Sequence, residues 1–291
     1  MAVDTHAPSG LHPADVAADA NAASTASPAW DWRRYARHVA ESLGYAIAGM
    51  GLLLAAWWVG GYLIQSDPDL SAFADFAPEP ALIRLVEMVQ SGEALGMIIP
   101  SLYRVGFGLF WAILIGVPAG ILVGWFSAFQ KLTNIPFQFL RMISPLSWMP
   151  IAVMAYATWD GAIIFLISVA AVWPVLFSTA AGLKRIDPAW FKVARNLGAR
   201  AWHMLAVIIL PAIAQDILTG IRLALGVAWI ILVPAEYLGV TSGLGYAIND
   251  ARDTLEYASL AAIVIIIGII GFTLDFILQL AIRHFSWLRS E

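Results

Sequence analysis

The chain has 291 residues, of which 60% are hydrophobic and only 12% are charged, and its formal net charge at pH 7 is −4. Soluble globular proteins carry about twice that share of charged residues, so the composition excludes an ordinary soluble enzyme and a disordered protein, and the negative charge argues against nucleic-acid binding. The sequence has no cysteine, which excludes disulfides, thiolate zinc sites, iron–sulfur clusters and cysteine nucleophiles. We expect one all-α membrane domain that crosses the bilayer several times.

The first 29 residues differ in composition from everything that follows. They are rich in alanine, serine, proline and aspartate, and they lack both the basic start and the apolar core of a secretory signal peptide. We predict a disordered tail over residues 1–30 and a transmembrane domain over residues 31–291. Arg33, Arg34 and Arg37 come directly before the first long apolar run.

Six segments are apolar over about 20 residues, the length that an α-helix needs to cross a bilayer. Their hydrophobic residues are continuous rather than alternating, which favours helices over the strands of a membrane barrel. The six predicted transmembrane helices are residues 43–65, 101–126, 136–157, 161–182, 212–234 and 258–282.

The distribution of basic residues predicts the orientation of these helices, because lysine and arginine are retained in cytoplasmic loops. With the N-terminus inside, Lys131 and the basic loop 183–206 are cytoplasmic, and the acidic segment 66–97 is outside. Only Arg84 and Arg252 then lie in outer loops. We therefore predict that both termini are cytoplasmic.

Small residues and prolines mark two of the spans. Gly116, Gly120 and Gly124 recur every four residues, a spacing that lets two helix backbones approach closely in lipid; a moving or substrate-lining surface is the alternative. Pro145 and Pro150 interrupt the start of the span 136–157 and leave backbone groups without helical partners. Such a broken helix either kinks for structural reasons or lines a pathway.

Ionisable side chains inside a bilayer are costly, so each one within a span is a candidate functional residue. Arg104 lies near the outer end of its span and is either an interfacial anchor or a pathway residue, and Glu236 closes the fifth span at the outer face. Arg222 lies near the middle of the fifth span. Its planar guanidinium could bind an anion or hold a neighbouring helix through a carboxylate such as Asp275. Asp216, six residues earlier, lies on a different helix face and need not pair with Arg222.

The basic loop between the fourth and fifth spans predicts a short helix–turn–helix. Asp187 can cap a helix whose first residue is Pro188, and Gly198 suits the left-handed end of that helix. A second helix then begins at Ala199 and breaks at Pro211. The apolar stripe of the first helix, at helical spacing, consists of Trp190, Val193, Ala194 and Leu197. This helix either rests on the bilayer surface or docks a cytoplasmic partner.

The same loop resembles the coupling loop of ATP-binding-cassette (ABC) importer permeases. That loop has the form E-A-A-x-x-x-G, followed by an aliphatic stretch and L-P. Here Ala194, Gly198 and Leu210-Pro211 match the form in spacing, while Lys192 and Val193 replace the Glu and the first Ala.

Two further stretches narrow the resemblance to the nitrate/sulfonate/taurine branch of this family. Residues 220–236, which run from Gly-Ile-Arg-Leu-Ala to Ala-Glu, look like the fifth-span signature of the branch, and the Gly-Leu-Gly of residues 243–245 follows as it does there. Residues 143–150, Ile-Ser-Pro-Leu-Ser-Trp-Met-Pro, look most like nitrate-type permeases, a group that also contains bicarbonate and cyanate relatives. The resemblance covers residues 40–288.

The resemblance implies a type I ABC importer permease with about six transmembrane helices in a bacterial inner membrane. Two copies of the chain would form the translocation path as a homodimer, two cytoplasmic ATPase subunits would dock on the coupling loops, and an extracytoplasmic binding protein would deliver substrate. ATP and Mg²⁺ would be used by the partner ATPases. This chain would bind no cofactor and lacks a G-x-x-x-x-G-K-[ST] phosphate loop. Nitrate is the first expected substrate, with sulfonate or taurine, bicarbonate and cyanate as alternatives.

The resemblance and the placement of charges together select the candidate site residues, none of them catalytic or metal-binding. The expected ATPase-coupling residues are Asp187, Trp190, Lys192, Ala194, Arg195, Gly198 and Ala199. The expected translocation-pathway residues are Arg104, Trp148, Met149, Arg222, Trp229 and Glu236.

Two other classes of function compete with this interpretation. A membrane-embedded enzyme would need a convergent site, but the five histidines are not spaced as metal ligands, and neither G-x-S-x-G nor H-E-x-x-H occurs. A secondary transporter would favour an inverted repeat and more intramembrane acids, and the two halves of this sequence show no convincing repeat.

Overall fold

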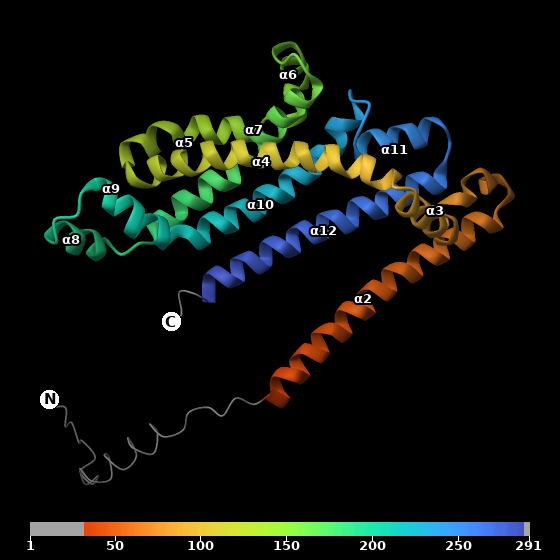
Figure 1. Cartoon of the computed structure of the whole chain (residues 1–291), viewed down its shortest axis with the longest axis horizontal. Helices are drawn as coiled ribbons and strands as arrows, with labels where there is room; N and C mark the ends of the chain where they lie inside the picture. The colour runs from red at the N-terminus through yellow and green to blue at the C-terminus, as the bar shows by residue number, and fades with distance from the viewer. Residues whose placement is uncertain (1–31, 288–291) are drawn as a thin grey trace, which may run out of the picture. The chain divides into compact units, whose positions relative to one another are not determined.

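The computed structural model describes residues 32–287, so the predicted tail 1–30 lies outside the described residues. Contacts separate the chain into two compact units, residues 1–59 and 60–291, and each is described by itself. Within the described range every regular element is helical (Figure 1). This confirms the predicted all-α fold.

Among residues 32–287, five helices are long and apolar enough to cross a membrane, and they confirm five of the six predicted spans. These segments are Leu43–Ser66, Glu93–Trp125, Trp159–Lys184, Ala201–Tyr237 and Tyr257–His284. The helices that contain them are α2 (Trp32–Ser66), α4 (Glu93–Trp125), α7 (Trp159–Lys184), α10 (Leu210–Tyr237, preceded by shorter turns) and α12 (Tyr257–Trp287). The connecting elements on the predicted outer side are η1 (Pro68–Phe76), α3 (Pro78–Ser91) and α11 (Leu244–Asp253).

The prediction of one continuous helix over residues 136–157 is wrong. The chain forms α5 (Ser127–Met142), the 3₁₀ turn η2 (Pro145–Trp148) and α6 (Met149–Ala155) instead. Pro145 forces the residue before it out of the helical region, and Ser144 is accordingly extended, with φ −57° and ψ 127°. The proline therefore ends the helix that the apolar composition favours.

Helices α4 and α7 run parallel and form the most extensive helix–helix contact of the described chain. An added Cβ at Gly108, Gly116, Gly120 or Gly124 would collide with Ile167, Val175, Thr179 or Leu183, respectively, so the partner numbers rise together along the two helices. This confirms the predicted close approach at the four-residue glycine spacing. Because α4 and α7 point the same way, the intervening chain must return across the membrane. Helices α5 and α6 make that return, and neither is long enough by itself to be counted among the membrane-spanning helices.

Helix α10 packs antiparallel to α7 and also contacts α12 (Figure 1). Gly220 lies against Ser178, and Asp216 lies against Gly182, so residue numbers rise on α10 as they fall on α7. The largest apolar core cluster lies between α6, α7 and α10 and is centred on residues such as Ile163, Leu166 and Leu232, all fully buried.

The basic loop forms the predicted helix–turn–helix, but its second helix does not break at Pro211. Helix α8 (Pro188–Asn196) is followed by α9 (Ala201–His203) and a π-helical turn η3 (Met204–Ile209), which leads directly into α10. The Leu210 N–H donates to the Leu205 carbonyl five residues back. Pro211 is tolerated because it directly follows this π-helical turn, and a local π adjustment accommodates a proline within a continuous helix.

Candidate functional site

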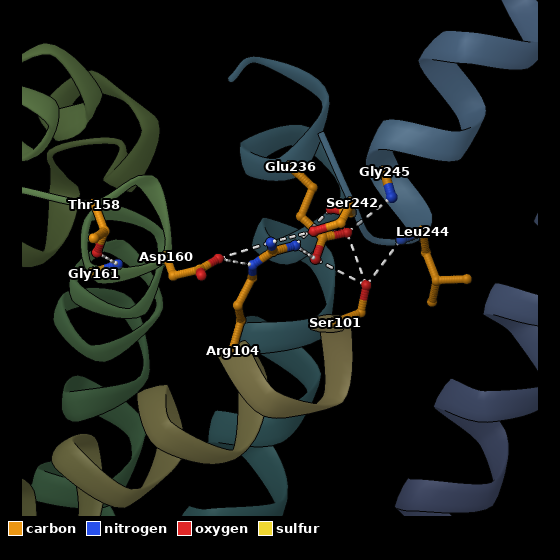
Figure 2. Close-up of polar contacts among 9 residues, drawn as sticks. All are labelled: Ser101, Arg104, Thr158, Asp160, Gly161, Glu236, Ser242, Leu244 and Gly245. Atoms are coloured by element: carbon orange, nitrogen blue, oxygen red, sulfur yellow. Dashed lines mark hydrogen bonds and ion pairs between the residues drawn. The ribbon is translucent and has the colours of Figure 1, made fainter. Parts of the chain in front are cut away.

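A buried cluster of charges joins α4, α7 and α10 near their predicted outer ends (Figure 2). Arg104 is only 2% exposed and Glu236 is fully buried. Nη1 of Arg104 donates to Oε1 of Glu236 over 2.6 Å. Nε and Nη2 of the same guanidinium lie 2.8 and 2.7 Å from Oδ1 of Asp160, at the start of α7. One arginine of α4 thus holds a carboxylate from each of the two neighbouring helices.

The remaining hydrogen-bonding capacity of Glu236 is also used. The hydroxyl of Ser101 lies 2.8 and 2.9 Å from the two carboxylate oxygens. The Gly245 N–H donates to Oε2 over 2.9 Å, and the Leu244 N–H donates to the Ser101 hydroxyl over the same distance. A buried carboxylate is stable only when it is paired and hydrogen-bonded in this way.

The turn that supplies these backbone donors requires glycine. Gly243 has φ +109°, and a Cβ there would lie 2.5 Å from Oε1 of Glu236 and 2.6 Å from Nη1 of Arg104. Its neighbour Ser242 accepts from Nη1 of Arg104 through its carbonyl over 2.8 Å, and its hydroxyl lies 3.0 Å from Nη2. All three guanidinium nitrogens are engaged, so Arg104 and Glu236 have no edge left for a transported ion in this conformation.

A second ion pair lies within the membrane-spanning part of the bundle. Nε and Nη2 of Arg222, on α10, donate to Oδ1 and Oδ2 of Asp275, on α12, both over 2.7 Å. Asp275 is the carboxylate that the sequence analysis named as a possible partner through which Arg222 could hold a neighbouring helix. The two side chains are 37% and 45% exposed, unlike those of the outer cluster. With a rise of 1.5 Å per residue, Arg222 lies about 21 Å along α10 from Glu236.

A third ion pair marks the predicted cytoplasmic end of α10. Asp216 pairs with Arg185, which follows the C-terminus of α7, and not with Arg222. This agrees with the expectation that Asp216 and Arg222 face different ways. A cavity of about 580 Å³ surrounds this pair, and its lining includes Gln215, Thr219 and Trp190.

Helix α8 carries the expected coupling residues on two sides. The Asp187 side chain accepts from the Ala189 N–H and so caps the helix, and Gly198 has the predicted left-handed conformation, with φ +77°. The residues of the predicted apolar stripe differ in solvent exposure: Val193 is 58% exposed, while Ala194 is only 5% exposed. Ala194 therefore faces the permease itself and lies away from the exposed side of α8. Its methyl group packs into a cluster with Leu183 of α7 and residues of η3 and α10.

The other residues of the helix are divided between these two sides. Phe191 contacts Trp125 of α4, with ring centroids 5.3 Å apart, and Ala199 is partly buried in the same cluster. The exposed side chains of the segment include those of Trp190, Lys192, Val193, Arg195 and Leu197.

Three further pathway candidates lie in packed positions. Met149 is buried in the main core cluster, and Trp148 packs against it. Trp229 lies between α10 and α12, where a Cβ on Gly271 would be 2.6 Å from its indole nitrogen. Sequence reasoning missed Ser101, Asp160 and Ser242. A signal for Asp160 was available, because an intramembrane arginine needs carboxylate partners and Asp160 begins a helix at the same predicted outer face.

Comparison with known proteins decides the family. The family of binding-protein-dependent transport system inner membrane components matches residues 112–286, more than half of the chain. The chain belongs to this family. It is a multi-pass inner membrane protein and a permease of the ABC importer class, as the coupling-loop resemblance implied.

Several relatives place the permease within that class. It is 38% identical over 193 residues to the bicarbonate transport system permease protein CmpB of Synechococcus elongatus, and the match spans 66% of each chain. A Brucella melitensis protein named as an ABC transporter permease is 32% identical over 82% of this chain and 96% of its own length. A Bacillus subtilis relative, provisionally named as an aliphatic sulfonates transport permease protein, is 34% identical over 82% of this chain and 86% of its own length.

A solved structure supports the fold. The MetNI methionine ABC transporter, in inward facing conformations, contains a chain that matches with a TM-score of 0.50 at 15% identity, covering 64% of this chain and 93% of the other. At this identity the likeness concerns the fold alone. It agrees with a type I importer permease architecture.

Proposed function

We propose that this permease is the membrane-spanning subunit of an ABC importer that carries a small anion into the cell. Family membership supports a role in transport, and the names of two relatives supply bicarbonate and sulfonates as the kind of cargo. The observation that carries the proposal is the two-sided character of α8. One side packs into the permease and the other presents exposed apolar residues, among them Val193 and Leu197, which is what a partner-docking helix needs.

The proposed partners follow from this helix. Two cytoplasmic ATPases, which use ATP and Mg²⁺, would dock on α8 of two permease copies, and an extracytoplasmic binding protein would deliver the anion. Because Ala194 and Phe191 of α8 pack against Leu183 of α7 and Ile213 of α10, a displacement of α8 would be passed to these two helices. Motion would therefore reach the part of α10 that carries Asp216 and Arg222 through direct packing.

Nitrate, bicarbonate and sulfonates are equally good proposals for the anion. The Trp-Met-Pro segment that resembles nitrate-type permeases packs in the core, with Met149 buried, so it offers no argument for nitrate through direct contact. All three anions present an O–X–O fork that a guanidinium can bind. The shared chemistry of the cargo is a small oxyanion.

The test is reconstitution of the permease with its ATPases and binding protein in proteoliposomes. We expect ATP-dependent accumulation of one of three labelled anions, namely nitrate, bicarbonate or taurine. Liposomes that lack the binding protein and liposomes given a non-hydrolysable ATP analogue are the controls.

The rival classes predict different results. A secondary transporter would accumulate the anion without ATPases when an ion gradient is imposed. A membrane-embedded enzyme would convert a substrate without moving it. If the permease assembles with no ATPase, the proposed function is wrong.

A further inference from the structure

The exposed face of α10 is polar over its cytoplasmic half. Gln215 and Arg222 are seven residues apart and so share one helix face, and Thr219 lies between them on the same side. Gln215 and Thr219 are exposed, as is Gly226, where a Cβ would meet nothing within 4 Å. The same face also carries the exposed Leu223, and beyond Gly226 it becomes apolar at Ile230. Polarity is therefore confined to the half of the face that leads to the cytoplasm.

This polar stretch connects the mid-membrane ion pair with the cytoplasmic cavity. Thr219 and Gln215 line the cavity that holds Arg185 and Asp216. Arg222 follows Thr219 by three residues, about 5 Å along the helix axis. The polar stretch along α10 thus runs from the guanidinium of Arg222 to that of Arg185.

Contact with lipid is unfavourable for the exposed face of α10 that carries Arg222. The side chains of Arg222 and Asp275 are 37% and 45% exposed, and ionisable groups at membrane depth face the bundle interior or a water-filled space. This face of α10 must therefore contact either water or another protein surface.

The geometry of Arg222 favours water that holds an anion. Asp275 binds the edge formed by Nε and Nη2. Within the described part of the chain, Nη1 has no hydrogen-bond partner, so the Nη1–Nη2 edge of the same guanidinium is open. That edge matches two oxygens of nitrate, bicarbonate or a sulfonate as it would match a carboxylate.

We propose that Arg222 is an anion-binding station at the start of a water-filled exit route, which passes Thr219 and Gln215 and reaches Arg185. The proposal rests on the proposed function, since it names the site that the small oxyanion would occupy. Asp275 is a positioning residue: it orients the guanidinium and its charge keeps the anion weakly held, which transit requires. Arg185, paired with Asp216, is the second station at the cytoplasmic end.

The natural absence of cysteine allows a direct test. Single-cysteine variants Thr219→Cys and Ile277→Cys are made in the assembled transporter in open membrane fragments. Ile277 is the matched control, because it is exposed on α12 two residues from Asp275 and so faces away from the ion pair. Both variants are treated with the anionic reagent sulfonatoethyl methanethiosulfonate and with its cationic trimethylammonium counterpart.

We expect Thr219→Cys to react with the anionic reagent while Ile277→Cys stays unreactive, because a thiol in lipid does not ionise. Adding nitrate, bicarbonate or taurine, whichever the unmodified transporter accumulates, should slow the reaction of Thr219→Cys. Arg222→Gln in the same background should abolish this protection and lower the anionic-to-cationic rate ratio about fourfold, the effect of one charge about 10 Å away in water on two reagents of opposite sign. Asp275→Asn should shift protection to lower anion concentration, because it removes a charge that repels the anion.

Arg222→Lys guards against a folding artefact, since it keeps the charge but loses the fork. It should preserve the anionic preference and weaken the protection. If Thr219→Cys stays as unreactive as Ile277→Cys, protein or lipid covers this face of α10, and that result would overturn the proposal. Labelling without charge preference or anion protection would show water but no anion station and would overturn it too. Neither readout needs ATP, so a failure of ATP-driven uptake would be seen separately.

Discussion

Arg104 and Glu236 are 132 residues apart in the sequence and form a 2.6 Å ion pair that is buried between α4 and α10. Glu236 is surrounded by donors from Ser101 and from the backbone of residues 244 and 245. The pair therefore fixes the outer ends of the helices and the turn after α10 in one arrangement. A change of the outer end of the bundle during transport would have to move this cluster as a unit or break it.

Glu236→Gln should destabilise the permease, because it leaves the buried guanidinium with less compensating charge. Breaking a buried ion pair from one side costs about 3–5 kcal/mol. Thermal unfolding of the purified permease in detergent measures the effect. The control is Arg252→Gln, which removes a surface pair with Asp253 and should cost about 0–1 kcal/mol. Equal unfolding temperatures for the two variants would contradict the structural role of the cluster.

Gly120→Ala should weaken the packing of α4 on α7. An added Cβ would lie 2.6 Å from the Leu176 carbonyl and from Cβ of Thr179, and such overpacking costs about 1–3 kcal/mol. Gly106→Ala is a matched control in the same helix, because a Cβ there meets nothing within 4 Å. Unfolding temperature should fall for the first variant and stay level or rise for the second. If the unfolding temperature falls equally for both variants, the cause is the loss of glycine from the helix backbone and not a collision with α7.

Val193→Asp and Ala194→Asp should fail in different ways although they are adjacent. The exposed Val193 position should accept aspartate with the permease folded, while ATP-driven uptake is lost because the docking surface is charged. Aspartate at the buried Ala194 position leaves a carboxylate in an apolar cluster, so the permease itself should lose stability. Co-purification of the ATPases and unfolding temperature separate the two effects. Normal ATP-driven uptake by Val193→Asp would contradict the proposal that α8 docks the ATPases.

Gly243→Ala should be more damaging than Gly92→Ala. Gly92 is in the left-handed helical region, with φ 80° and ψ 0°, where a side chain costs about 1–2 kcal/mol. Gly243, with φ 109° and ψ 171°, is in a region that essentially only glycine adopts. At Gly243 the new Cβ would also strike the buried charges of Glu236 and Arg104. The difference between the two unfolding temperatures therefore reports the greater backbone strain and this clash together. Equal losses would show that the turn is free to move away from the cluster.

Local chemistry explains which parts of the fold could be predicted. The apolar runs were long enough to specify five helices, and the Asp187–Pro188 pair marked the start of α8. The prediction failed where two local signals competed: residues 136–157 are apolar enough for a span, yet Pro145 breaks the helix. It failed again at Pro211, because the π-helical turn before it lets α10 begin there without a break.

The sequence by itself determined that this protein lies in the membrane, that it crosses it several times, and that a capped basic loop stands between two spans, since these are consequences of hydropathy, charge and residue type along the chain. Only the tertiary structure decided that Arg104 pairs with Glu236 and Asp160, that Arg222 pairs with Asp275, and that Ala194 is buried beside the exposed Val193. These facts depend on the register in which helices distant in sequence pack together, and that register is set by side-chain fit between helices, which no periodicity within one helix contains.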